Sequence, residues 1–212
     1  MLFRSLLLDL DDGRAWIFHM GMSGRLHYSD EPVVVAGLHD HVLAFFRDGG
    51  ALVFHDPRRF GLCVVDDVRD SKLLAGMGPE PLDRETFHAE YFSGFRRRTA
   101  RTVKDVLMDQ RVVAGLGNIY VNEILFRAGV RPRRSMARTS LAECERIVEA
   151  TRTVIADAIE HRGSTISDFL DAIGRRGGYQ SEHLVYDREG QPCPRCGAAI
   201  KAVVVGDRKS VV

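Results

Sequence analysis

Residues 108–128, MDQRVVAGLGNIYVNEILFRA, combine the features of a helix end, a glycine turn and a new helix start. The turn falls at Gly115-Leu116-Gly117, where two residues without a Cβ allow another backbone to come close. Asn118 follows at the position of a helix cap, and the amides of a helix N-terminus bind phosphate. The stretch predicts a helical hairpin. Two interpretations stay open, an ordinary glycine-linked connection and a phosphate-binding turn.

The charges of the chain are unevenly distributed. The 212 residues are 45% hydrophobic, enough for one large or two small domains with packed cores, and the net charge is only +1. Acidic runs lie early, at residues 9–12 and 66–67, whereas basic runs at 95–104 and 131–134 flank the glycine turn. A nucleic-acid partner is therefore indicated by the distribution of charge and not by the total.

The sequence shows no apolar run long enough to span a membrane and no secretory signal peptide, so a reduced cytoplasmic compartment is expected. Cys63 and Cys144 stand singly in apolar patterns, which is typical of small buried side chains. Cys193 and Cys196 form the single closely spaced cysteine pair.

The N-terminal third has the pattern of antiparallel strands. Residues 6–10 and 15–18 form one predicted hairpin and residues 42–46 and 51–54 another, which together suggest a β-sandwich or barrel. Two loops are too particular in composition to be simple connections. They are HMGMSGR at residues 19–25 and HDPRRFG at residues 55–61.

The remainder of the chain has a helical pattern. Glycines and prolines in residues 67–94 predict a linker, and the helical period begins near Arg96. Residues 140–162 predict a long helix with Ser140 and Glu143 at capping-box spacing and Gly163 at its end. Its expected apolar face is Leu141, Cys144, Ile147, Val148, Ile155 and Ile159. A shorter helix is expected over residues 164–173, and a β-like tail follows.

Seven segments, in this order between about residues 6 and 208, resemble the bacterial formamidopyrimidine-DNA glycosylases and their relative endonuclease VIII. They are HMGMSG, HDPRRFG, GMGPEPL, KDVLMDQ, GLGNIYVNEILF, GSTISDF and GQPCPRCG. The resemblance implies an α+β fold in three parts. These are an incomplete β-sandwich at residues 1–80, a helix-two-turns-helix DNA-binding domain at 81–175, and a lesion-loop region with half of a zinc finger at 176–212.

The resemblance also implies a function in base-excision repair. The family are DNA glycosylases and abasic-site lyases that act on oxidised purines such as 8-oxoguanine and formamidopyrimidines in double-stranded DNA. A monomer in the bacterial cytoplasm, associated with the nucleoid, is expected. The two alternatives are a non-catalytic module that binds damaged DNA and a structural nucleic-acid-binding protein.

Three residues match the family positions that fill the gap left by a flipped nucleotide: Met22, Arg58 and Phe60. Met and Phe can wedge between bases, and Arg offers a planar donor group to the orphaned base. The alternative for Met22 and Phe60 is a place in the hydrophobic core. Arg58 lies between Pro57 and Gly61 in a segment that is hard to bury.

Further residues are expected to contact DNA. By the resemblance, His19, Lys104, Asn118 and Arg208 hold the backbone around the flipped nucleotide and His39 contacts DNA elsewhere, while Arg98 and Arg101 belong to the basic run. Phosphate oxygens accept hydrogen bonds from charged side chains, from side-chain amides and from the N–H groups of a helix N-terminus. The alternatives are hydrogen-bonded strand histidines for His19 and His39 and a solvated helix lysine for Lys104.

Two expectations depart from the family. The family's nucleophile is an N-terminal proline amine with a glutamate beside it. This sequence begins Met1-Leu2-Phe3-Arg4, so no catalytic residue is assigned, and Arg4 stands where the family has a lysine. Cys193 and Cys196 provide half of a four-ligand zinc site, so weak or no zinc binding and a poorly positioned Arg208 are expected.

Two further expectations concern stability and specificity. The helical region, roughly residues 85–175, is expected to be more stable than the incomplete sandwich, because a sandwich without its first strand exposes an edge. The segment GRRGGYQ at residues 174–180 is expected to lie over the lesion pocket. It matches the family only loosely, and the sequence predicts no lesion preference.

Overall fold

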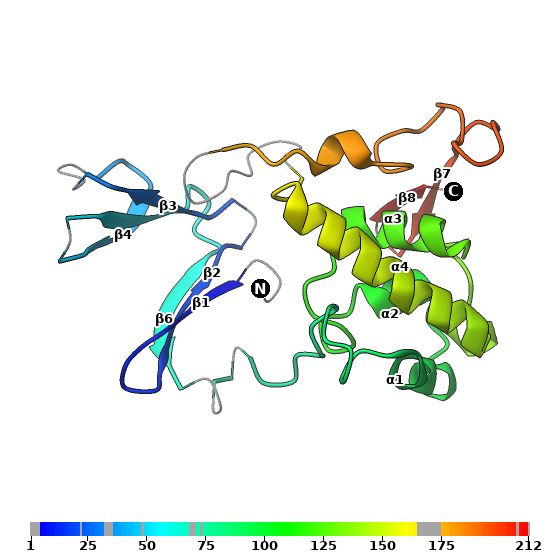
Figure 1. The fold of residues 1–212 in the computed structure, drawn as a ribbon, viewed down its shortest axis with the longest axis horizontal. Helices are drawn as coiled ribbons and strands as arrows, with labels where there is room; N and C mark the ends of the chain where they lie inside the picture. Colours follow the sequence, from blue (N-terminus) through cyan, green and yellow to red (C-terminus); the bar gives the residue numbers. More distant parts are fainter. Residues whose placement is uncertain are drawn as a thin grey trace. The chain divides into compact units, whose positions relative to one another are not determined.

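The computed structural model describes residues 5–21, 23–31, 36–47, 49–67, 71–72, 74–164, 175–206 and 208–211. The chain forms two compact units, which are coloured along the sequence in Figure 1. Residues 1–75 and 161–180 make the sandwich unit, and residues 76–160 and 181–212 make the helical unit. The three-part division expected from the sequence stays a prediction.

The sandwich unit contains two antiparallel sheets of three strands each. One has the order β1 (Ser5–Asp9), β2 (Ala15–His19), β6 (Leu62–Asp66), and the other β3 (Arg25–Ser29), β5 (Ala51–His55), β4 (Asp40–Phe45). Both predicted hairpins, β1–β2 and β4–β5, are confirmed. The first turns at Gly13, whose φ of 84° is readily adopted only by glycine.

Aromatic and aliphatic side chains from both sheets form the core between them. Phe18 of β2, Leu26 of β3, and Leu52 and Phe54 of β5 are buried in one cluster. The rings of Phe18 and Phe54 meet edge to face with their centroids 5.7 Å apart. The two sheets therefore pack as the layers of a sandwich, and the barrel alternative is wrong.

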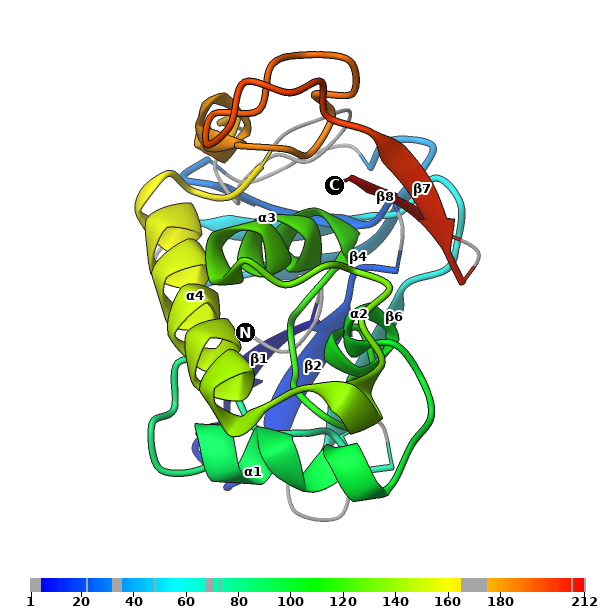
Figure 2. The same ribbon diagram turned by 90° about the vertical axis from the view of Figure 1, so that its right-hand side faces the viewer.

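The helical unit packs short helices around one long helix. Its elements are α1 (Ala89–Ser93), the 3₁₀ turn η1 (Gly94–Arg97), α2 (Val103–Leu107), α3 (Asn118–Ala128), η2 (Met136–Arg138), α4 (Leu141–Glu160), and the strands β7 (Ala202–Val205) and β8 (Arg208–Val211). A further 3₁₀ turn, η3, covers Tyr179–Glu182. Helix α4 packs against both α3 and α1, as the two views in Figures 1 and 2 show.

The long helix α4 confirms the capping box and corrects its predicted face. The Glu143 amide donates to Ser140 Oγ at 3.1 Å, and the Ser140 amide donates to Glu143 Oε2 at 2.7 Å. Cys144, Ile147 and Val148 are buried as predicted, whereas Leu141 and Ile159 are exposed. The buried stripe follows the helical period through Thr151, Val154 and Ala158 instead.

The two single cysteines lie in apolar surroundings, as expected. Cys144 is buried, which raises the pKa of its thiol to about 11. Cys63 is half-buried beside the sandwich core, and the Trp16 indole donates a hydrogen bond to its sulfur at 2.9 Å.

The segment expected to be a linker is more structured than the sequence indicates. Helix α1 begins at Ala89, before the predicted onset of helical structure at Arg96. Gly78 donates its amide to the Gln110 carbonyl at 2.8 Å, and a Cβ on Gly78 would lie 2.5 Å from the Val112 backbone. The GMGPEPL segment is therefore packed against the turn between α2 and α3.

The predicted helix at residues 164–173 lies almost wholly outside the described residues.

Within the described residues, no helix is both long enough and apolar enough to cross a membrane.

Candidate nucleic-acid interface

In the sandwich unit, the loop after β5 presents the predicted wedge residues to solvent. Phe60 is 58% exposed, and Arg58 is also exposed. The Arg58 guanidinium lies over the Phe60 ring, 5.1 Å from its centroid, an arrangement that holds both side chains together. The alternative that Phe60 belongs to the core is wrong. Met22, the third predicted wedge residue, lies outside the described residues.

The two predicted DNA-contacting histidines have different surroundings. His19 ends β2, and its Nδ1 is 2.9 Å from Ser5 Oγ, so it is a half-buried, hydrogen-bonded strand histidine. His39 lies in the turn before β4, where its ring meets the His55 ring at 5.8 Å. A DNA contact by either one stays a prediction.

A contact with Asp40 holds the ring of His55, which His39 meets. His55 Nδ1 lies 2.7 Å from Asp40 Oδ1. Burial raises the pKa of Asp40, but hydrogen bonds from His55 and the Gly37 amide outweigh this effect, and the pKa lies below its ordinary value. The ring against which His39 rests is therefore held in place.

In the helical unit, one side chain clamps the two turns between α2 and α3. Gln110 Nε2 donates to the Leu116 carbonyl at 2.9 Å, while its Oε1 accepts from the Gly115 amide at 2.9 Å. Asp109 binds the guanidinium of Arg111 and that of Arg101, which hold the pKa of this carboxyl well below its ordinary value. The sequence identified the turn but missed both residues that hold it.

Asn118 is not the cap of α3. Gly117 occupies the N-cap position, and Asn118 is the first helical residue, so the capping prediction is wrong by one position. The Asn118 carbonyl accepts a hydrogen bond of 2.7 Å from Asn122 Nδ2, one turn later. Because the cap is a glycine, its own side chain cannot bind the first amides of the helix.

Lys104 is buried under β8 and is 1% exposed, so the alternative of a solvated lysine is wrong. Its Nζ donates to Ser210 Oγ at 2.5 Å and to the Lys209 carbonyl at 3.1 Å. Burial lowers the pKa of Lys104 to about 8, a change that Asp105 opposes and Arg208 reinforces. This lysine binds α2 to the strand that carries Arg208.

Two polar residues of α3 complete the attachment of the C-terminal segment. Asn122 Oδ1 accepts from the Val211 amide of β8 at 3.1 Å. The carboxylate of Glu123, which is 0% exposed, accepts from the amides of Leu184, Val185 and Tyr186 at 2.8, 3.0 and 2.8 Å. The strand that carries Arg208 is thus bound to both α2 and α3, whereas a DNA contact by the Arg208 side chain stays a prediction. The signal in the sequence was a pair of polar residues inside an apolar helix.

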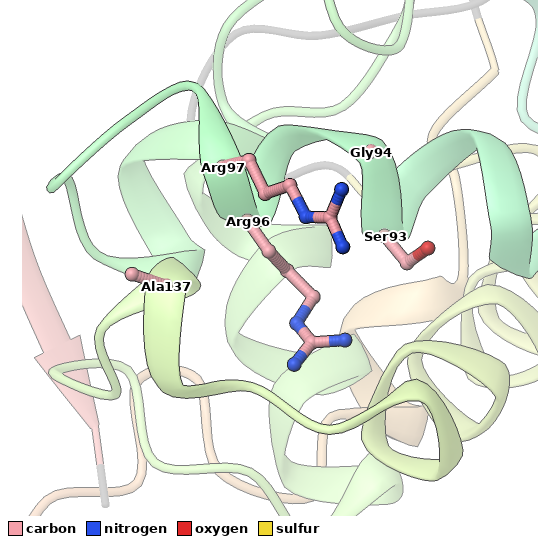
Figure 3. A pocket seen from close by; sticks show the side chains of 5 residues that line it. All are labelled: Ser93, Gly94, Arg96, Arg97 and Ala137. Atoms are coloured by element: carbon pink, nitrogen blue, oxygen red, sulfur yellow. The ribbon is translucent and has the colours of Figure 1, made fainter.

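The basic run has several separate roles in the structure. Arg101 donates to Asp109 at 2.8 Å and to the Asp105 carbonyl, whereas Arg98 is exposed and lies 5.9 Å from the Phe95 ring centroid. Arg96 and Arg97 line a shallow hollow of about 300 Å³ with Ser93, Gly94 and Ala137, shown in Figure 3. Arg101 is thus bound within the protein, and only the other arginines of the basic run can bind an anion.

Comparison with known protein families covers most of the chain. The formamidopyrimidine-DNA glycosylase N-terminal domain matches residues 4–63, and the H2TH domain of the same enzymes matches residues 77–170. The formamidopyrimidine-DNA glycosylase of Acidithiobacillus ferrooxidans is 44% identical over 207 residues, which are 97% of this chain and 76% of that protein. This chain belongs to the formamidopyrimidine-DNA glycosylase family.

Solved structures of the family have the same fold. The MutM (Fpg) protein of Thermus thermophilus is 38% identical with a TM-score of 0.85, over all of this chain and 78% of that one. The Lactococcus lactis Fpg, solved in complex with DNA containing an abasic site, is 29% identical with a TM-score of 0.87 and the same coverage. The α+β fold and the place of this chain among base-excision repair glycosylases follow from these matches.

The zinc finger of the family, found in FPG and IleRS, matches residues 190–212. Cys193 and Cys196 lie in a tight turn, in which the Cys193 amide donates to the Ala198 carbonyl at 2.7 Å and the Gly197 amide donates to the Cys193 carbonyl at 2.9 Å. The Arg195 and Cys196 amides point to Cys193 Sγ and lower its pKa. The two thiols fit a zinc site, but no set of three or more metal ligands occurs among the described residues.

Proposed function

We propose that this chain recognises double-stranded DNA that carries an oxidised purine or an abasic site, in base-excision repair. The observation that carries this proposal is the exposed Arg58–Phe60 pair on a loop of a family glycosylase. A folded protein gains little stability from a phenylalanine that is 58% exposed. A ring that stacks in a duplex explains this exposure.

The pair suits the gap that a flipped nucleotide leaves. Flipping costs a few kcal/mol of lost stacking and pairing, which the protein must offset. The Phe60 ring supplies an apolar surface for the neighbouring bases, and the Arg58 guanidinium supplies donors for the partner base. Because the two side chains already stack on each other, little side-chain freedom is lost on binding.

The helical unit carries its own candidate donors to DNA. The N-terminus of α3 offers its amides at Asn118, and β8 offers Arg208, which Lys104 and Asn122 hold in place. Amides and guanidinium groups are the usual donors to DNA phosphates. Arg98 is an exposed cation in the same unit and adds positive charge to it. Arg101 is bound to Asp109 and stabilises the turn.

Glycosylase and abasic-site lyase chemistry is the activity we infer for the chain from its family. That chemistry needs a neutral amine that attacks the sugar C1′ and forms an imine. The contacts described above serve recognition, since Lys104 Nζ is buried and bound to β8. A second candidate function is the binding of damaged DNA without catalysis, which the same recognition contacts would support. A purely structural nucleic-acid-binding role leaves the exposed wedge unexplained.

The test uses duplexes that contain 8-oxoguanine or an abasic site, with borohydride to reduce any imine. Covalent trapping supports the glycosylase and lyase. Reversible binding to the abasic duplex without trapping supports the recognition module alone. If the chain neither traps nor prefers the damaged duplex over an undamaged one, the proposed function is wrong.

A further inference from the structure

Asp56 lies at the centre of the loops that carry the proposed wedge residues. It belongs to the HDPRRFG segment but is not one of the proposed DNA-contacting residues. It directly follows β5 and is 1% exposed. Its Oδ1 accepts from the Ser23 hydroxyl at 3.1 Å, and its Oδ2 accepts from the Gly61 amide at 2.6 Å. The two oxygens thus bind two separate loops.

The backbone of Asp56 binds a third segment. Its amide donates to the His39 carbonyl at 2.9 Å, and its carbonyl lies 2.9 Å from Nε2 of His41. The Arg59 amide also donates to this carbonyl at 3.3 Å. His39 and the two loops of the wedge are therefore connected through one buried residue.

The charge of Asp56 is stabilised by the same donors. Burial raises the pKa of its carboxyl, but the Gly61 amide, the Ser23 hydroxyl and the amides of Arg58 and Arg59 lower the pKa below its ordinary value. A buried carboxylate without such donors would be costly. The conformation of residues 58–61 is therefore coupled to the charged form of Asp56.

The two loops pack closely. A Cβ on Gly21 would lie 2.6 Å from the Phe60 carbonyl oxygen, and a Cβ on Gly61 would lie 2.5 Å from the Phe54 ring and 2.9 Å from Asp56 Oδ2. Arg59 adopts a φ of 57°, which a non-glycine residue rarely adopts unless its surroundings impose it. The hydrogen bonds of the Arg59 and Gly61 amides to Asp56 lie on either side of this strained position.

We propose that Asp56 is a positioning residue. It holds the HDPRRFG loop to the described part of the preceding loop, Gly21 and Ser23, so that Arg58 and Phe60 are set for insertion before DNA arrives. The inference rests on the proposed function for its effect on DNA, but the coupling of the loops can be measured without DNA. Insertion of a loop that is already ordered costs less conformational entropy than insertion of a flexible one.

The first experiment compares Asp56→Asn with the wild type by amide hydrogen exchange. An asparagine keeps the size of the side chain but removes the charge. With its oxygen on the Gly61 amide, its NH₂ group faces the Ser23 hydroxyl, so two charge-assisted hydrogen bonds become weaker neutral ones. We expect faster exchange in both loops, including the Gly61 amide, and unchanged exchange in α4. Asp9→Asn, at an exposed strand end, is the matched control. Unchanged exchange in the two loops of Asp56→Asn overturns the inference whatever the chain binds.

The second experiment measures the ratio of affinities for abasic and undamaged duplexes. Asp56→Asn should lower this ratio about as far as Phe60→Ala does, whereas affinity for the undamaged duplex and its salt dependence, which report phosphate contacts, should not change. A 2-aminopurine beside the abasic site should lose its unstacking signal in both variants. If Asp56→Asn keeps the wild-type affinity ratio and 2-aminopurine signal while Phe60→Ala loses both, the inference is contradicted.

Ser23→Ala covers the case in which Asp56→Asn fails to fold. It removes the hydrogen bond between the Ser23 hydroxyl and Asp56 and leaves the one from the Gly61 amide in place. An intermediate ratio, with faster exchange confined to the two loops, supports the inference, and wild-type values for both measurements contradict it. If the wild type itself shows no preference for the abasic duplex, the proposed function fails, and the exchange experiment still decides the role of Asp56.

Discussion

Glu123 provides the sharpest test of how the C-terminal segment is held on the helical unit. Its carboxylate is fully buried, with Oε1 accepting from the Val185 and Tyr186 amides and Oε2 accepting from the Leu184 amide. In Glu123→Gln, one oxygen can still accept from two amides, but the NH₂ group meets the third donor. Glu123→Ala leaves all three amides without their acceptor.

The expected magnitudes follow from these contacts. A buried donor without its partner costs about 1–3 kcal/mol, and the loss of hydrogen bonds to a charged acceptor is at the upper end of this range. We therefore expect Glu123→Gln to lower the free energy of unfolding of the helical unit by about 2 kcal/mol, and Glu123→Ala by about 4–6 kcal/mol. With a urea dependence of about 2 kcal/mol per M, the first change lowers the midpoint by about 1 M.

The chain offers a separate signal for each unit. Trp16, the sole tryptophan, lies in β2 of the sandwich unit, whereas all described α-helices lie in the helical unit. Urea unfolding should show the shift in circular dichroism at 222 nm and little change in tryptophan fluorescence. Glu145→Gln, on the exposed side of α4, is the control. The reasoning is refuted if Glu123→Gln behaves like Glu145→Gln, or if the fluorescence transition moves by the same amount.

Three further predictions concern Lys104, the Gln110 clamp and the relative stability of the two units. Between about pH 8 and about pH 10.4 the unfolded chain binds more protons at Lys104 than the folded chain, so the free energy of unfolding should rise with pH across this window by up to about 3 kcal/mol. In urea unfolding, Lys104→Met should lack this rise relative to the wild type. Cys144 contributes the opposite slope in both proteins, so parallel pH curves of the two would contradict the prediction. Gln110→Ala removes the clamp on the turn and should raise exchange at Gly115 and weaken affinity for undamaged duplex; unchanged exchange there would show that the clamp is dispensable. Limited proteolysis should digest the sandwich unit before residues 85–175, and survival of the N-terminal half alone would contradict that order.

Local features were predictable from the sequence where the residues that define them are close together. The hairpins at β1–β2 and β4–β5 depend on alternating strands and short turns, and the start of α4 depends on Ser140 and Glu143. The misplaced cap at Asn118 shows the limit of this reasoning, because a glycine beside an asparagine leaves the boundary uncertain by one residue.

Features that depend on distant partners could not be predicted. Lys104 has the sequence surroundings of an exposed helix residue, and only the return of β8 to α2 buries it. Asp56 belongs to the HDPRRFG segment, but its partners Ser23 and His39 come from other loops. Glu123 likewise binds amides about sixty residues later. A polar residue inside an apolar helix, such as Glu123, signals in the sequence that a partner exists, but only the tertiary contacts show which groups it binds.

The most direct measurement of the central claim is the affinity of the wild-type chain and of Phe60→Ala for a duplex with an abasic site and for the same duplex undamaged. An abasic site has no base to unstack, so a protein that fills the gap should prefer it. The wild type should prefer the abasic duplex by about ten-fold or more, and Phe60→Ala should lose most of this preference while keeping its affinity for the undamaged duplex. Equal affinity of the wild type for both duplexes would contradict the account.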